Sequence, residues 1–224
     1  MRAIVLGATG LIGGLLLERL LADPVVTAVK VIGRRPLGKQ HPKLQEVIID
    51  FNDAASFSAQ FNNADCVCCC VGTTRQLVKG NKEAYRRVDF DIPVHAAQYA
   101  VAAGVQRFML VSSVGANASS GQFYLRLKGE TEQAVLHEAI PAIYIMRPSM
   151  LLGKRHPPRF TERMVQPVMQ GLSFFLRGRL AKYKAIQAKD VAAAILHAVK
   201  QTRKGHFIWE YNELMKASSA EAVT

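Results

Sequence analysis

The sequence predicts an α/β protein with a Rossmann-like, doubly wound parallel sheet and a small C-terminal extension on the substrate side. Three observations lead to this fold class. Short apolar, β-branched runs alternate with helical patterns as far as about residue 150, without an internal repeat. The first apolar run breaks directly into glycines and then into a leucine-rich helical pattern. The run at 66–71 is continuously apolar, as expected for a parallel strand that is buried on both faces.

The length and composition suit one folded domain. Half of the 224 residues are hydrophobic, which excludes disorder over most of the chain. We expect a single NAD(P)-binding domain over residues 1–215, with substrate-side and C-terminal elements at 150–206, and a frayed tail at 216–224. No apolar run reaches about 18 residues without a charge or a helix breaker, and the sequence opens in a strand, which indicates neither a membrane span nor a signal peptide. We therefore expect a cytoplasmic protein.

The first strand, Ala3–Leu6, runs into three glycines spaced for a phosphate-binding turn. Gly7 permits the sharp turn, Gly10 lets the backbone approach a pyrophosphate, and Gly13 lets the following helix pack closely against the sheet. The start of that helix presents unpaired N–H groups, which favour a phosphate. A glycine-rich loop without a ligand is the alternative. The expected contacts of a dinucleotide here are Gly7, Thr9, Gly10, Leu11, Ile12 and Gly13.

The second strand, Ala28–Ile32, is followed by two arginines, and this position decides the cofactor. Folds that prefer NAD usually place an acid here to bind the ribose hydroxyls. Arg34 and Arg35 instead suit a 2′-phosphate, so the sequence favours NADP over NAD. The alternative is a pair of solvated surface arginines.

Two further strand ends carry polar residues that could reach the cofactor. Asp50 and Phe51 follow the third strand, Val47–Ile49, where Asp50 could bond the adenine amino group or cap the next turn. After the fourth strand, Cys66–Val71, come Gly72, Thr73 and Thr74, at the edge where such sheets bind ligands. All four cysteines of the chain lie in this strand. Such a crowded cluster fits neither a disulfide framework nor a zinc site, so we expect buried reduced thiols and no metal, the alternative being a redox role for Cys70.

The remaining elements follow the same alternation and then become less regular. We expect a long interrupted helix in which Pro93 lies near an internal start and Gly104 is the stop. This long helix covers Asn81–Ala103. The other expected strands are Gln106–Val111, Ala142–Met146 and an edge strand at Phe207–Trp209. The other expected helices are Phe123–Glu138, an apolar helix near Phe160–Leu172 and Ala188–Val199.

A tyrosine and a lysine carry the expected chemistry. Tyr124 and Lys128 stand four apart in a predicted helix, so they share one face. A nearby ammonium favours the phenolate and brings proton transfer within reach, and Lys128 can also hold the nicotinamide ribose. The hydroxyl of Ser113, which we prefer to Ser112, could bond the substrate carbonyl. The alternative is a half-exposed aromatic side chain with a lysine neighbour.

These stretches resemble a known family. GATGLIGG, VGTTR, LVSSVGA and YLRLKGETE are similar to the NAD(P)-binding atypical short-chain dehydrogenase/reductases, including the TIP30-type oxidoreductases and their small bacterial relatives. The resemblance implies that the phosphate turn, the arginine pair and the serine, tyrosine and lysine serve the cofactor and catalysis as above. It also implies adenine and nicotinamide-ribose contacts at Asp50, Gly72 and Val88. The loop before Tyr124 is shorter than in extended sugar-nucleotide enzymes, which argues against a nucleotide-sugar substrate.

Together these features predict an NADP(H)-dependent oxidoreductase that transfers hydride to or from a carbonyl or alcohol. The alternatives are an NADPH-sensing regulatory or binding protein without turnover and a sugar-nucleotide epimerase or dehydratase. We expect a small-molecule substrate and no specific nucleic-acid partner, and the sequence leaves a homodimer open. The segment 151–204 has twelve Lys or Arg against two acids and reads as a solvated or substrate-steering face. The apolar residues Phe160, Met164, Phe174 and Phe175 read as core or as a substrate wall.

Overall fold

Seven parallel strands form the central sheet of the computed structural model, which describes residues 1–153 and 178–222. The strand order is β3-β2-β1-β4-β5-β6-β9, which confirms the Rossmann-like α/β fold. The strands are β1 (Arg2–Leu6), β2 (Ala28–Gly33), β3 (Leu44–Ile48), β4 (Cys66–Cys69), β5 (Arg107–Val111), β6 (Ala142–Met146) and β9 (Gly205–Trp209).

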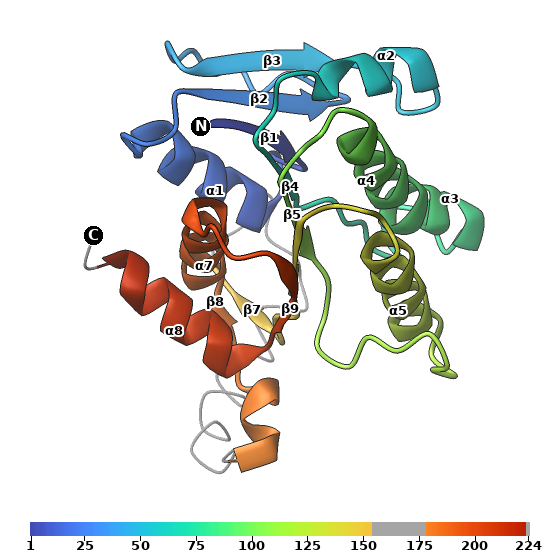
Figure 1. The fold of residues 1–224 in the computed structure, drawn as a ribbon. Coiled ribbons are helices and arrows are strands. Elements are labelled where there is room, and N and C mark those ends of the chain that lie inside the picture. Colours follow the sequence, from blue (N-terminus) through green and yellow to red (C-terminus); the bar gives the residue numbers. More distant parts are fainter. Residues whose placement is uncertain (154–177, 223–224) are drawn as a thin grey trace.

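The central strands are apolar throughout because the sheet is covered on both faces. Figure 1 shows helices α1 (Leu11–Ala22), α7 (Ala188–Lys200) and α8 (Tyr211–Ala222) on one side of the strands, and α4 (Ile92–Ala102) and α5 (Phe123–Leu136) on the other. Alternate residues of one strand therefore enter different cores. In β4, Cys66 and Cys68 belong to the core under α1 and α7, whereas Val67 and Cys69 belong to the core under α4.

Strands β3 and β4 end earlier than predicted, and one short helix was not predicted. β3 begins and ends earlier than the predicted Val47–Ile49, and β4 ends at Cys69, before the predicted Val71. The helix α2 (Ala54–Ser58) is capped by Asp53, whose carboxylate accepts a hydrogen bond from the Ser56 amide, and it continues into the 3₁₀ turn η1 (Ala59–Phe61). A helix of five residues is too short to leave a periodic pattern in the sequence.

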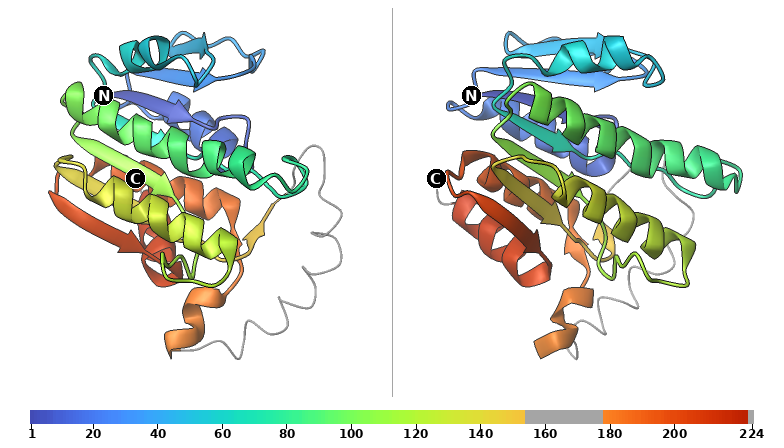
Figure 2. Two further views of the ribbon diagram at one scale, coloured as in Figure 1. Left: turned by 90° about the vertical axis from the view of Figure 1, so that its right-hand side faces the viewer. Right: turned by 45° about the vertical axis from the view of Figure 1, so that its right-hand side comes forward.

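The long interrupted helix is present and contains a π-helical turn. It consists of α3 (Lys82–Arg86), the π segment η2 (Arg87–Asp91) and α4, and Pro93 lies in the first turn of α4. Gly104 follows its end with a φ of +70°, the left-handed conformation that glycine adopts at helix stops. Figure 2 shows α4 and α5 side by side over one face of the sheet.

In the C-terminal region, one expectation from the sequence is wrong. The edge strand and the helix before it are present as β9 and α7. The tail from Lys216, which we expected to fray, is instead helical as far as Ala222, because α8 buries Leu214, Ala217 and Ser218 against α7. The predicted helix at 160–172, with Phe160 and Met164, and the apolar pair Phe174 and Phe175 lie outside the described residues.

Smaller elements complete the C-terminal side. The strands β7 (Leu151–Leu152) and β8 (Ile186–Gln187) pair in parallel as a separate ribbon, and the 3₁₀ segment η3 spans Gly178–Tyr183. Within residues 1–153 and 178–222, no helix is both long and apolar enough to cross a membrane.

Candidate active site

The carboxyl ends of β1, β4 and β5 bring the candidate site residues to one edge of the sheet. From β1, the chain adds β2 and β3 on one side of the sheet and then β4, β5 and β6 on the other, so the topological switch point lies between β1 and β4. Ligands of open α/β sheets bind in the crevice outside such a switch point. The glycine turn follows β1, Gly72 to Thr74 follow β4, and Ser113 follows β5. The sheet therefore gathers residues that are distant in the sequence.

Close backbone packing explains two of the three glycines. A Cβ atom at Gly7 would lie 2.6 Å from the carbonyl oxygen of Cys70, and the φ of Gly7 is +83°. A Cβ at Gly13 would lie 2.2 Å from the carbonyl oxygen of Gly7, so α1 can approach the turn only with glycine there. The turn is closed by a hydrogen bond of 2.9 Å from the Gly10 amide to the Gly7 carbonyl.

The first turn of α1 has the properties of an anion site. Gly10 is its N-cap and offers no side-chain cap, and the first turn contains no acidic residue. Thr9 is exposed beside it. The side chain of Ile12 is buried in the core and that of Leu11 packs partly against it, so both can meet a phosphate only through their backbone amides.

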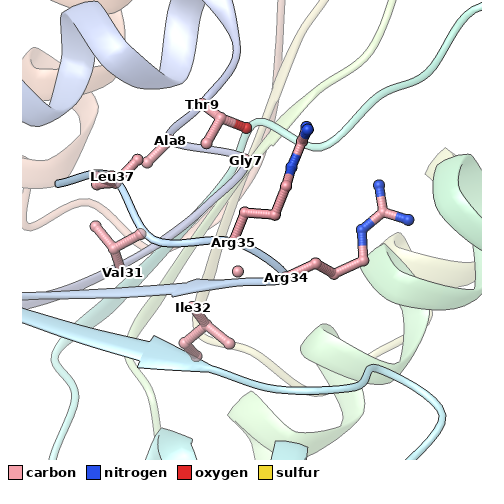
Figure 3. Close-up of a pocket in the computed structure, with 9 residues that line it drawn as sticks. Gly7, Ala8, Thr9, Val31, Ile32, Arg34, Arg35 and Leu37 are labelled. Carbon is pink, nitrogen blue, oxygen red and sulfur yellow. The ribbon is translucent and has the colours of Figure 1, made fainter. Parts of the chain in front are cut away.

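A pocket joins the glycine turn to the two arginines. It is lined by Gly7, Ala8, Thr9, Val31, Ile32, Gly33, Arg34, Arg35 and Leu37. Figure 3 shows the side chains of Arg34 and Arg35 extending outward from the end of β2. Both are exposed, and no ion pair with either guanidinium occurs among the described residues. The structure thus brings the predicted phosphate turn and the predicted 2′-phosphate residues to one pocket.

Asp50 and Phe51 are not among the residues that line that pocket. The Asp50 carboxylate accepts hydrogen bonds from the backbone amide of Asn52 at 3.0 Å and from its side-chain amide at 2.8 Å, which is the turn-capping alternative. Phe51 is half-buried and packs edge-on against Phe57, with 4.9 Å between ring centroids. Neither residue lines the pocket beside Arg34.

The helix α5 carries Tyr124 and Lys128 in contrasting environments. Tyr124 is 40% exposed, whereas Lys128 is buried. The Lys128 ammonium forms an ion pair of 2.9 Å with Oδ1 of Asp89, a residue of the π segment η2. Burial by itself lowers the pKa of Lys128, but the charges of Asp89 and Tyr124 outweigh this effect and raise it above its ordinary value.

Asp89 also fixes the backbone that follows β4. Its Oδ2 accepts a hydrogen bond of 2.8 Å from the Thr73 amide, and Gly72 lies beside its Oδ1, where a Cβ would make an ordinary van der Waals contact of 3.6 Å. Tyr85, one turn earlier in α3, donates its hydroxyl to the Thr73 carbonyl at 3.2 Å. Val88, the residue implied by the resemblance, lies next to Asp89 in the same π turn and is half-buried.

The two adjacent serines have different surroundings. Ser112 is buried, and its hydroxyl donates to the carboxylate of Glu132 on α5. Glu132 in turn accepts hydrogen bonds from Arg147, at 3.0 and 3.1 Å from the Arg147 Nε. Ser113 is half-exposed, and its hydroxyl makes a long contact of 3.4 Å with the Val114 carbonyl. Ser112 is therefore committed to a structural network, while the Ser113 hydroxyl can turn toward a ligand.

Sequence reasoning missed three residues of this region: Asp89, Tyr85 and Glu132. All three act through partners on other elements, so no local spacing reveals them. One signal was present for Asp89 and Glu132, because a carboxylate predicted on the inner face of a packed helix needs a cationic partner.

Comparisons with known proteins agree with this architecture. The sequence profile of a family described as NAD(P)H-binding matches residues 7–202. The chain is 34% identical over 158 residues to Protein HTATIP2 of Rattus norvegicus, covering 69% of this chain and 64% of that protein. It is 31% identical over 207 residues to Protein FMP52, mitochondrial, of Debaryomyces hansenii, covering 90% of this chain and 88% of that protein. The chain thus spans somewhat less than two thirds of the HTATIP2 relative.

A solved structure shares the fold. A short-chain dehydrogenase/reductase superfamily protein from Agrobacterium tumefaciens, solved with bound NAD, superposes with a TM-score of 0.72 at 16% identity, covering 94% of this chain and 77% of that one. The same comparisons correct one expectation. FMP52 relatives are named as mitochondrial proteins, so the expectation of a cytoplasmic protein is wrong. The expectation rested on the lack of a long apolar run, which bears on membrane spans and not on the compartment of a folded domain.

Proposed function

The chain belongs to the NAD(P)H-binding family and carries an NAD(P)-binding Rossmann-like domain, and on that premise we propose that it is an NADP(H)-dependent oxidoreductase of the short-chain dehydrogenase/reductase type. Its substrate is a small carbonyl compound or the corresponding alcohol. One observation carries the proposal: α5 presents an exposed phenol and a buried ammonium one turn apart, at the sheet edge where the glycine turn and Ser113 also lie.

The arginine pair supports NADP rather than NAD. The end of β2 offers two guanidinium groups and no carboxylate to the pocket of the glycine turn. A 2′-phosphate accepts charge-assisted hydrogen bonds from guanidinium groups, whereas a ribose 2′-hydroxyl gains little from them. The uncapped first turn of α1 fits the pyrophosphate, because the first amides of a helix have no partner within it and no acidic side chain lies in this turn.

Each candidate side chain has a defined task. A bound nicotinamide supplies the hydride for reduction, or accepts it when an alcohol is oxidised. Tyr124 gives its hydroxyl proton to the carbonyl oxygen during reduction and takes it back in the reverse direction. Ser113 donates a hydrogen bond to the same oxygen and stabilises the charge that develops there. Lys128 keeps a positive charge beside the phenol and favours the phenolate that remains after proton transfer.

The test combines cofactor binding with a screen of carbonyl substrates. NADPH and NADH are titrated separately into the protein, and NADPH oxidation is then followed with aldehydes and ketones of increasing size. We expect tighter binding of NADPH than of NADH and turnover of at least one carbonyl class. Tyr124→Phe should reduce kcat by about 10²- to 10⁴-fold, the usual contribution of a general acid, with little change in NADPH affinity.

Tyr99→Phe is the matched control. Tyr99 lies on α4, packs against Phe57 and Phe61, and belongs to no part of the proposed site. Equal turnover by wild type and Tyr124→Phe would remove Tyr124 as the acid. A preference for NADH would remove the argument from Arg34 and Arg35. Tight NADPH binding without turnover of any carbonyl would favour the cofactor-sensing alternative.

A further inference from the structure

Lys128 lies in a place where an ammonium needs a counter-ion. Its side chain is 7% exposed, and that of Asp89 is 1% exposed. An amine this deeply buried tends to lose its proton, because the neutral form avoids the cost of desolvation. The contact of 2.9 Å with Asp89 opposes that tendency.

Asp89 is the carboxylate that faces Lys128 from the packed elements. From β4, Cys69 faces the pair, and burial raises the pKa of this thiol to about 12, so it is neutral at ordinary pH. On α5 itself, Glu132 is occupied by Ser112 and Arg147, and Glu130 is paired with Arg86 at 2.9 Å on the outer side. Within residues 1–153 and 178–222, the Lys128 ammonium makes no ion pair other than the one with Asp89.

The position of Asp89 is held independently of Lys128. Its second carboxylate oxygen accepts a hydrogen bond from the Thr73 amide, and its own backbone carbonyl lies 3.0 Å from the Thr131 hydroxyl, whose single proton it shares with the Leu127 carbonyl at 2.8 Å. The π turn η2 therefore joins the loop after β4 to α5 through one residue. A counter-ion fixed in this way also fixes the direction of the lysine side chain.

We propose that Asp89 is a positioning residue that keeps Lys128 charged, so that its ammonium can stabilise the ionised form of the Tyr124 phenol. This inference rests on the proposed role of Tyr124 as acid and base. Without Asp89, the buried ammonium gives up its proton first, and the phenol then lacks the neighbouring charge that stabilises its ionised form.

The test follows the ionisation of one phenol by its near-ultraviolet absorbance. The difference between each protein and its Tyr124→Phe counterpart isolates Tyr124 from the other five of the six tyrosines. We expect Asp89→Asn to move the Tyr124 titration upward by about one pH unit or more, close to its position in Lys128→Met. Adding Lys128→Arg to Asp89→Asn should move it back, because an arginine stays protonated without a counter-ion.

Controls and an independent measurement complete the design. Asp89→Glu should restore part of the wild-type behaviour, and Asp91→Asn, in the same π turn, should leave the titration unchanged. In the wild-type protein, the nitrogen-15 resonance of Lys128 Nζ, identified by its loss in Lys128→Met, should remain that of an ammonium above pH 10.5, the ordinary lysine value. This measurement does not depend on the folding of any Asp89 variant.

The outcomes separate this inference from the proposed function. A Tyr124 titration that stays in place or moves downward in Asp89→Asn would overturn the role of Asp89, as would deprotonation of wild-type Lys128 below pH 10.5. Neither readout requires a substrate. Absence of turnover with a shifted titration would therefore refute only the proposed oxidoreductase function, and turnover with an unshifted titration would refute only the role of Asp89.

Discussion

Ser112 and Ser113 are neighbours in the sequence, but their hydroxyl groups serve different parts of the molecule. Successive residues at the end of a strand point to opposite faces. Ser112 therefore reaches the carboxylate of Glu132, which Arg147 also binds, and Ser113 is left at the crevice. The same hydroxyl group thus stabilises the fold at position 112 and is proposed to act in catalysis at position 113.

This contrast makes a prediction for two matched substitutions. Ser113→Ala should lower kcat/KM by about 10²- to 10³-fold, as the loss of one donor to a developing oxyanion does, with an unchanged free energy of unfolding. Ser112→Ala should instead lower the free energy of unfolding by about 1.5 to 3 kcal/mol, because a buried hydrogen bond to a charged group is lost. Urea unfolding and steady-state kinetics on both variants check this. The opposite assignment of effects would make Ser112 the substrate-binding hydroxyl.

At the scale of elements, the loop between Ser113 and Tyr124 crosses α5 and its backbone packs directly on that helix. A Cβ at Gly129 would lie 2.1 Å from the Ala118 amide nitrogen and 2.3 Å from the carbonyl carbon of Asn117. The Asn117 amide also donates a hydrogen bond of 3.0 Å to the Leu125 carbonyl. Gly129 therefore allows the loop to pack directly on the helix that carries Tyr124 and Lys128.

Replacing this glycine should separate the loop from the helix. Gly129→Ala should lower the free energy of unfolding by about 1 to 3 kcal/mol through overpacking, although alanine by itself favours a helix. Gly121→Ala is the matched control, since a Cβ at that position meets nothing within 4 Å, and its effect should stay within about 0.5 kcal/mol. Urea unfolding of the two variants measures the difference. Equal stabilities would show that the loop moves aside without cost.

Features that depend on a few consecutive residues could be predicted from the sequence, whereas contacts between separate elements could not. The glycine turn and the arginines after β2 are local signals, because each depends on a few consecutive residues. The helix α8 was missed because its residues are small and polar and its stability comes from packing on α7. The ion pair of Asp89 with Lys128 was missed because it joins two separate elements, and only the three-dimensional arrangement creates it.

At the scale of the whole molecule, the thiols of β4 occupy the centre of the sheet. β4 lies between β1 and β5 with both faces covered, and Cys66, Cys68 and Cys69 are fully buried. A hydrogen bond with Cys66 and burial raise the pKa of Cys68, and burial raises the pKa of Cys69 to about 12 and that of Cys70 well above its ordinary value. The three thiols of β4 therefore act as small apolar side chains in the core, and Cys70, which follows the strand and is half-buried, packs against it.

Raised thiol pKa values make stability depend on alkaline pH. The unfolded chain loses thiol protons near the ordinary value of 9.0, whereas folded Cys69 keeps its proton until about pH 12. Stability is thus unaffected by this group below about pH 9 and falls as the pH rises toward 12, by up to about 1.4 kcal/mol per pH unit for each thiol. Lys128, whose pKa is also raised, adds a decrease of the same sign above its ordinary 10.5.

Urea unfolding of the reduced protein at a series of pH values from 8 to 10.5 should therefore show a plateau and then a decline. Cys69→Ala removes one titrating group, so its slope above pH 9 should be shallower than that of the wild type by up to about 1.4 kcal/mol per pH unit. The difference in stability between Cys69→Ala and the wild type on the plateau measures the cost of losing the buried thiol volume, and only the difference in slope reports ionisation. A wild-type stability that stays flat to pH 10.5 would mean that the thiols of β4 ionise within the folded sheet.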